Sequence, residues 1–118
     1  MNKPAKCISV DAARELRDQW LDTRGSYYRL ANGGNEDCSD VFYTLAELEE
    51  YIEYVKTQSK DQGIEKPGIR IYFGAYADGG KRATVFLAPT VSEMSDSDNN
   101  YKIDPFNLNQ GGWPPNNY

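Results

Sequence analysis

Residues 69–77, IRIYFGAYA, constrain the fold of this chain more than any other segment. Apolar residues occupy every second position from its first residue onward, and a period of two is typical of a β-strand with one buried face. Residues 78–81, DGGK, are typical of a turn, and residues 82–90, RATVFLAPT, predict a returning strand. The sequence therefore predicts a β-hairpin over residues 69–90.

The register of this hairpin depends on the length of its loop. A two-residue Gly-Gly turn would place Phe73 opposite Phe86, whereas a loop with an odd number of residues places Val85 and Leu87 on the face of Ile71 and Phe73. The odd loop makes one face wholly apolar, so we expect that register. We also expect Ile71, Phe73, Val85 and Leu87 to be buried together beneath a helix.

The other face of the hairpin would combine one arginine with several aromatic residues. Its members are Arg70, Tyr72, Tyr76, Thr84 and Phe86. Arginine and tyrosine supply much of the contact energy of protein interfaces, so this set is a candidate binding face. The alternative is a sheet surface that is half exposed or covered by another segment of the chain.

The first of two predicted helices spans residues 10–24. Its apolar residues recur at helical spacing, and they are Ala13, Leu16, Trp20 and Leu21. Ser9 is the expected N-cap, and Gly25 is expected to end the helix.

The second predicted helix spans residues 45–61. Thr44 and Glu47 fit a T-x-x-E capping box at its start, and Gly63 is expected to stop it. Its apolar stripe consists of Leu45, Leu48, Ile52 and Val55, with Tyr51 at the flank. We expect this stripe to cover the apolar face of the hairpin.

These elements predict an α+β fold in which two helices pack on one face of a small antiparallel sheet centred on the hairpin. At 118 residues, the chain is expected to form a single domain. Additional short strands are expected at residues 27–30, 38–43 and 101–103.

The C-terminal segment, residues 104–118, is rich in Asn, Gly and Pro but also carries aromatic residues. A disordered tail is usually poor in aromatic residues, and a buried aromatic side chain removes a large apolar area from water. We therefore expect a docked structural arm in which Phe106 and Trp113 insert against the domain. The alternatives are an arm that orders only on a partner and plain disorder.

The charge of the chain disfavours nucleic-acid binding. Thirteen basic against eighteen acidic residues give a net charge of −5, which does not attract polyanions. The sequence contains no membrane-length apolar run and no signal-peptide core, so a cytoplasmic location is expected. Cys7 and Cys38 are then expected to be thiols, with a disulfide as the alternative.

No catalytic, metal or cofactor site is predicted. The chain lacks histidine, which excludes Ser–His–Asp and Cys–His sites within one chain. Asp96, Asp98 and Asn100 have EF-hand spacing, but Tyr101 stands where the calcium loop needs glycine. We interpret this stretch as a solvated loop.

The chain resembles a group of small bacterial proteins of unknown function. The similarity lies in the pair Thr23–Arg24, the IRIYFG strand, the TVFLAPT-like strand and the DPFNxxQGGxPP ending. The resemblance implies an ordered C-terminal arm and assigns no activity.

The sequence is most consistent with a small cytoplasmic protein-binding or accessory protein of the inhibitor, immunity or regulatory type. Its candidate binding residues are Arg24, Arg70, Tyr72, Tyr76, Phe86 and Trp113. A protein partner is expected, and self-association stays open. The alternative is a small-molecule binder or an unusual histidine-free enzyme, in which Arg24 and Arg70 hold an anionic ligand. The other interpretation is that both arginines pair with nearby carboxylates on the surface.

Overall fold

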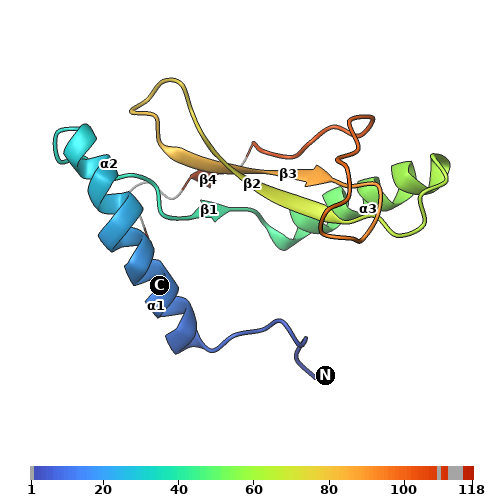
Figure 1. The fold of residues 1–118 in the computed structure, drawn as a ribbon, viewed down its shortest axis with the longest axis horizontal. Coiled ribbons are helices and arrows are strands. Elements are labelled where there is room, and N and C mark those ends of the chain that lie inside the picture. Colours follow the sequence, from blue (N-terminus) through green and yellow to red (C-terminus); the bar gives the residue numbers. More distant parts are fainter. Residues whose placement is uncertain (1, 109, 112–115) are drawn as a thin grey trace. The chain divides into compact units, whose positions relative to one another are not determined.

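A computed structural model describes residues 2–108, 110–111 and 116–118 of the chain (Figure 1). These residues form two compact units. The helical unit comprises residues 2–40 together with 116–118, and the sheet unit comprises the described part of residues 41–111. The single-domain organisation stays a prediction.

The helical unit contains one continuous helical run. α1 (Val10–Trp20) leads into a π-helical turn, η1 (Leu21–Gly25), which leads into α2 (Ser26–Ala31). Ser9 caps α1 as predicted, because its hydroxyl oxygen accepts a hydrogen bond from the Ala12 N–H at 3.0 Å.

The predicted helix end at Gly25 and the predicted strand at residues 27–30 are wrong. Gly25 keeps helical dihedral angles, with φ −61° and ψ −44°. It is buried, and a Cβ atom at this position would lie 3.5 Å from the Trp20 indole. That distance is an ordinary van der Waals contact, so Gly25 is simply one more residue of the helix and does not end it. The helical run ends only beyond α2, where Gly33 and Gly34 adopt positive φ.

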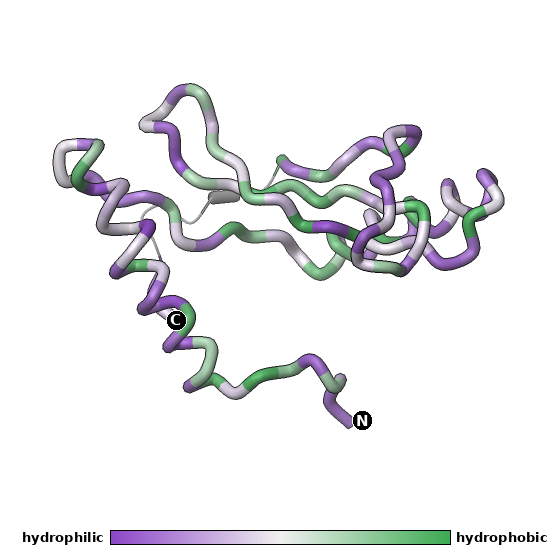
Figure 2. The backbone as a smooth tube through the Cα atoms, in the orientation of Figure 1, coloured by the Kyte–Doolittle hydropathy of each residue, from purple (hydrophilic) through white to green (hydrophobic). Residues whose placement is uncertain are grey.

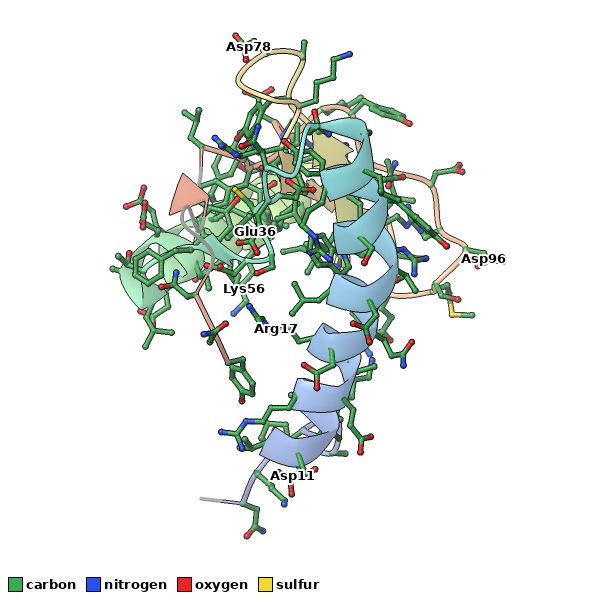
Figure 3. The ribbon with its side chains drawn as sticks, turned by 90° about the vertical axis from the view of Figure 1, so that its left-hand side faces the viewer. Asp11, Arg17, Glu36, Lys56, Asp78 and Asp96 are labelled. Atoms are coloured by element: carbon green, nitrogen blue, oxygen red, sulfur yellow. The ribbon has the colours of Figure 1, made fainter. Side chains whose placement is uncertain are left out.

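Few apolar side chains are covered in the helical unit. None of the residues of α1 is buried, and hydrophilic residues, drawn in purple, recur along the helix (Figure 2). Arg17 of α1 donates hydrogen bonds to the Ser39 hydroxyl at 3.5 Å and to the Asn117 side chain at 3.3 Å (Figure 3). Polar contacts thus connect the end of the chain to α1.

In the sheet unit, α3 (Leu45–Asp61) has the predicted bounds and the predicted capping box. Thr44 Oγ1 accepts from the Glu47 N–H at 3.0 Å, and the Glu47 carboxylate accepts from the Thr44 N–H at 2.8 Å. Gly63 adopts a φ of +77°, and the Ile64 N–H returns to the Ser59 carbonyl at 2.8 Å, which closes the C-terminus.

The predicted apolar stripe of α3 is wrong in part. Leu45 and Ile52 are 77% and 44% exposed, whereas Tyr51, which was expected at the flank, is only 5% exposed. The buried residues of the helix are Tyr51, Val55 and Ser59. The face of α3 that meets the core is therefore centred on Tyr51. Its hydroxyl donates to backbone carbonyl groups outside the helix.

β2 (Ile69–Ala75) and β3 (Ala83–Pro89) form a two-stranded antiparallel sheet, and with the helices they make a mixed α+β fold as predicted. Ile71 pairs with Leu87 and Phe73 with Val85, which confirms the predicted register. The loop between the strands has an odd number of residues, and Asp78 lies near its tip (Figure 3).

The predicted burial of the hairpin face is wrong for β2. Leu87 is buried and Val85 is partly buried, but Ile71 is 59% exposed and Phe73 is 91% exposed. The cause is the placement of the core, which forms against β3 alone. The core residues are Tyr51, Val55, Leu87 and Ile103, and Tyr43, Leu48, Val85 and Phe106 pack against them.

The segment around Phe106 covers the edge of β3. Phe106 and Leu87 exchange two backbone hydrogen bonds of 2.9 Å. The Phe106 ring stacks on Tyr51 and Tyr43 with centroid distances of 4.5 and 4.9 Å. Trp113 lies outside the described residues, so insertion of the whole arm stays a prediction.

Two other expected strands differ from the prediction. Within residues 38–43, only β1 (Val41–Phe42) is a strand, and it pairs with β4 (Gln110–Gly111). Residues 101–103 form turns and a bend, and Ile103 inserts into the core with 1% exposure. Among the described residues, no helix has both the length and the apolar character that a bilayer crossing requires.

Candidate functional site

Arg70, a predicted binding residue, is engaged within the protein. Its guanidinium donates to the Asn99 side-chain oxygen, to the Ser95 carbonyl at 2.8 Å and to the Ser97 carbonyl at 2.9 Å. These acceptors belong to a loop at residues 92–100, which also contains Asp96 (Figure 3). Arg70 therefore holds this loop against the hairpin.

Tyr72 and Phe86 come together as predicted for neighbours on one face. Their rings stack with centroids 4.9 Å apart, and Asn99 donates to the Tyr72 hydroxyl at 2.8 Å. This hydrogen bond lowers the pKa of the Tyr72 phenol below its ordinary value, and Arg70 adds to the effect. Both groups stabilise the phenolate form more than the burial of the ring disfavours it.

A pocket of about 280 Å³ lies beside these rings. Its walls are mainly aromatic and apolar, and they are formed by Tyr72, Phe86, Ala88, Pro89, Asn99, Asn100, Tyr101, Ile103 and Pro105. Its two amide side chains already have partners, since Asn99 bonds Tyr72 and Asn100 donates to Gln62 at 2.7 Å. The pocket is thus suited to a small apolar or aromatic molecule more than to an ion.

Tyr76 belongs to a polar network that ties the hairpin to the C-terminal segment. Its hydroxyl accepts from Thr84 at 3.2 Å and lies 3.5 Å from the Asn107 side-chain oxygen. The Asn107 amide group in turn donates to Thr84 at 3.2 Å and to the Val85 carbonyl at 2.8 Å. Tyr76 therefore supports the structure from the end of β2.

The edge of β2 that faces away from β3 is a surface that the sequence did not reveal. The N–H and C=O of Leu87 bond Phe106, and the Pro89 carbonyl accepts from Asn100 at 2.8 Å, so these groups point away from β2. In an antiparallel pair, the residues opposite them point their own N–H and C=O away as well. Ile71 and Ile69 therefore direct their backbone polar groups outward, to the free side of β2.

The alternation continues along the strand, so Phe73 and Ala75 also point their backbone groups outward. The described part of the chain supplies no hydrogen-bond partner for the outward groups of Ile69, Ile71 or Phe73. Their side chains are 38%, 59% and 91% exposed. We call these three residues, with their backbone, the β2 edge.

The sequence does carry a signal for this edge. Exposed edge strands are usually protected by lysine, proline or a bulge. Within residues 69–75 the only charged side chain is that of Arg70, which is bound to the 92–100 loop. The lack of a protecting residue was visible in the sequence, but which edge would stay open was not.

The remaining predicted site residues lie elsewhere. Arg24 is exposed on η1 in the helical unit, and its guanidinium donates to the Thr23 hydroxyl at 3.4 Å. Trp113 lies outside the described residues.

Cys7 is an exposed thiol and Cys38 is a buried one. Within residues 2–108, 110–111 and 116–118, no group of three or more Cys, Asp or Glu side chains is placed to hold a metal ion.

Comparison of the chain with protein-family models, with curated proteins and with solved structures finds no match. The function is therefore inferred from the geometry of the hairpin.

Proposed function

We propose that this protein is a small protein-binding or accessory protein, of the inhibitor, immunity or regulatory type, and that it binds through the β2 edge. The observation that carries the proposal is the 91% exposure of Phe73 on a strand whose outward N–H and C=O groups have no partner among the described residues. Large exposed aromatic side chains on an open strand edge are typical of protein contacts.

The proposal moves the contact surface from one face of the hairpin to its edge. Arg70, Tyr72 and Tyr76 make internal hydrogen bonds, so a partner that contacted them would have to compete with those bonds. The β2 edge offers backbone donors and acceptors together with apolar side chains. Such an edge supports binding by strand addition, in which main-chain hydrogen bonds give affinity and alternate side chains give specificity.

The cytoplasmic location and the resemblance to small bacterial proteins are parts of the same proposal. The acidic charge of −5 supports it as well, because it disfavours nucleic acid as the alternative partner.

The experiment is a comparative capture from lysate of the cells that produce the protein. The baits are the wild type, Phe73→Lys, and Leu108→Lys as a matched control, since Leu108 is 95% exposed. Leu108 follows the segment that bonds β3, on the side away from β2. We expect a protein that the wild type and the control both retain and that Phe73→Lys loses. Equal capture by all three baits would contradict the proposal.

Small-molecule binding is a second candidate, and the 280 Å³ aromatic pocket favours it. The anionic ligand expected from the sequence has weaker support, because Arg70 already makes three hydrogen bonds inside the protein. Tyr101, which is 89% exposed and lines the pocket, provides the test. We expect Tyr101→Ala to lower the affinity for a ligand found by thermal-shift screening. Phe73→Lys should leave that affinity unchanged.

A further inference from the structure

We propose that the β2 edge pairs with the same edge of a second copy of this chain, antiparallel and about a two-fold axis. The inference rests on the proposed function, because it names the partner of that same surface. It predicts a dimer in which β3 and β2 of one copy continue into β2 and β3 of the other. The two-stranded sheet would become a four-stranded one.

The backbone pattern of β2 is complementary to itself. Outward N–H and C=O groups recur at every second residue, at Ile69, Ile71, Phe73 and Ala75. An antiparallel partner must present outward groups with the same period, and a second β2 does so. With the two-fold axis at Tyr72, all residues of the strand are paired, and Ile71 lies opposite Phe73 of the second copy.

The side chains agree with this pairing. Ile69, Ile71 and Phe73 lie on one face of β2, the face that also carries the buried Leu87 of β3. Joining two copies places six apolar side chains on one continuous face, with an aromatic residue opposite a β-branched one. Such cross-strand pairs stabilise antiparallel sheets. The pairing would bring the exposed side chains of the two copies into contact and so reduce their exposure.

The charges do not oppose the pairing. Arg70 is the only charged residue of β2, and its guanidinium is bound to the carbonyls of Ser95 and Ser97 on the other face. All acidic residues of the chain lie outside the strand, so two copies repel each other only at longer range. Added salt screens that repulsion, and we therefore expect salt to strengthen the dimer.

A second copy is favoured over an unrelated strand for two reasons. Most homo-oligomers are closed by two-fold symmetry, which requires a self-complementary patch of the kind described here. A sheet of two strands is also smaller than the usual one, and pairing brings it to about four strands. The assembly should stop at the dimer, because residues 99–106 already cover the other edge of β3.

Sedimentation equilibrium of the full chain tests the inference. We expect the mass of the wild type to rise with concentration from 13.3 kDa to twice that value and no further. Phe73→Lys should stay monomeric, and Leu108→Lys should behave as the wild type. Phe73 lies outside the core, and circular dichroism should verify that its variant is folded. A wild type that stays monomeric at its solubility limit, or one that forms larger polymers, would overturn the inference.

Amide hydrogen exchange tests the pairing of the strands themselves. The N–H groups of Ile71 and Phe73 should become protected as the protein concentration rises. The N–H groups of Tyr72 and Gly74 point towards β3 and should be protected at every concentration. A dimer whose Ile71 and Phe73 amides exchange freely would also overturn the inference.

Failure of the inference can be separated from failure of the proposed function. A monomeric wild type that still captures a partner, and loses it on Phe73→Lys, refutes the second copy and supports the proposed function. A dimer with protected Ile71 and Phe73 amides, combined with equal capture by all baits, supports the second copy and refutes a different protein at this edge.

Discussion

Tyr51 joins three segments of the sheet unit through a single side chain. Its ring is buried in the core and stacks on Phe106, and its hydroxyl lies 2.9 Å from the Asp104 carbonyl and 3.3 Å from the Leu87 carbonyl. A buried hydroxyl needs such acceptors, because an unpaired polar group in a core is costly. The tyrosine therefore connects α3 to β3 and to the segment that follows the 92–100 loop.

Replacing Tyr51 with Phe should destabilise the protein by about 0.5–1.5 kcal/mol, the usual net contribution of one hydrogen bond. The packing of the ring is retained, so the loss reports on the hydroxyl. Urea unfolding measures it. Tyr54→Phe is the control, since Tyr54 is 39% exposed, and it should change the midpoint little. A Tyr51→Phe variant as stable as the wild type would contradict this role of the hydroxyl.

The same tyrosine predicts how stability changes at alkaline pH. Burial, with smaller effects of Tyr54 and Asp104, raises the pKa of Tyr51 to about 12, above its ordinary value of 10.0. Because the folded state favours the neutral phenol, its contribution is complete below pH 10 and is lost as the pH rises towards 12. The stability difference between the wild type and Tyr51→Phe should therefore shrink over this range. Curves of stability against pH that stay parallel for the two proteins would contradict the prediction.

Two phenylalanines should differ sharply when truncated to alanine. Phe73 is 91% exposed, so Phe73→Ala should change stability by no more than about 0.5 kcal/mol. Phe106 packs against the core, so Phe106→Ala should cost up to about 3–5 kcal/mol, the range for buried phenylalanines. The comparison should use protein dilute enough to be monomeric. A large loss of stability in Phe73→Ala under those conditions would show that the Phe73 ring belongs to the core.

At the scale of elements, α3 depends on its capping box. Thr44→Ala removes the acceptor for the Glu47 N–H and should cost about 1 kcal/mol. Thermal unfolding measures the loss. Thr57→Ala, a substitution within the same helix and away from its cap, is the control and should stabilise slightly, by no more than about 0.7 kcal/mol, because alanine has the higher helix propensity. Equal effects of the two substitutions would show that the cap contributes nothing specific.

The elements that the sequence predicted best are those with local signals. The capping box of α3 involves residues three positions apart, and the hairpin register follows from alternation plus an odd loop. Gly25 was misread because glycine ends a helix where it adopts a positive φ, whereas Gly25 keeps helical dihedral angles, a choice that the residue type does not reveal.

The candidate site could not be predicted in the same way. Alternation shows that Ile71 and Leu87 share a face, but it does not show which strand the core will cover. That choice depends on Tyr51 and Phe106, which lie far from the hairpin in sequence and pack against β3. Arg70 was likewise recognisable as a polar residue of the opposite face, whereas its acceptors are loop carbonyls that carry no sequence signal.

At the scale of the whole molecule, the two compact units differ in how they are stabilised. The sheet unit contains the described hydrophobic core, whereas α1 buries none of its residues. We predict that a fragment of residues 41–111 unfolds cooperatively on its own, because all members of the core cluster lie within it. Differential scanning calorimetry of the fragment measures this. A broad transition without a heat-absorption peak would mean that the sheet unit needs the rest of the chain.

The π-helical turn η1 has a consequence for insertions and deletions. The Ser26 N–H bonds the Leu21 carbonyl five residues earlier, so this turn holds one residue more than an α-helical turn. Removing one residue here would let ordinary α-helical bonding run from α1 through α2. Because the wide turn already absorbs the extra residue, its removal would leave the faces of α2 in nearly their present alignment with those of α1, whereas a deletion within α1 would turn α2 by about 100° about the helix axis. The loss of one codon at η1 would thus preserve which faces of the helical run are exposed, and η1 is the position where this run tolerates a change in length.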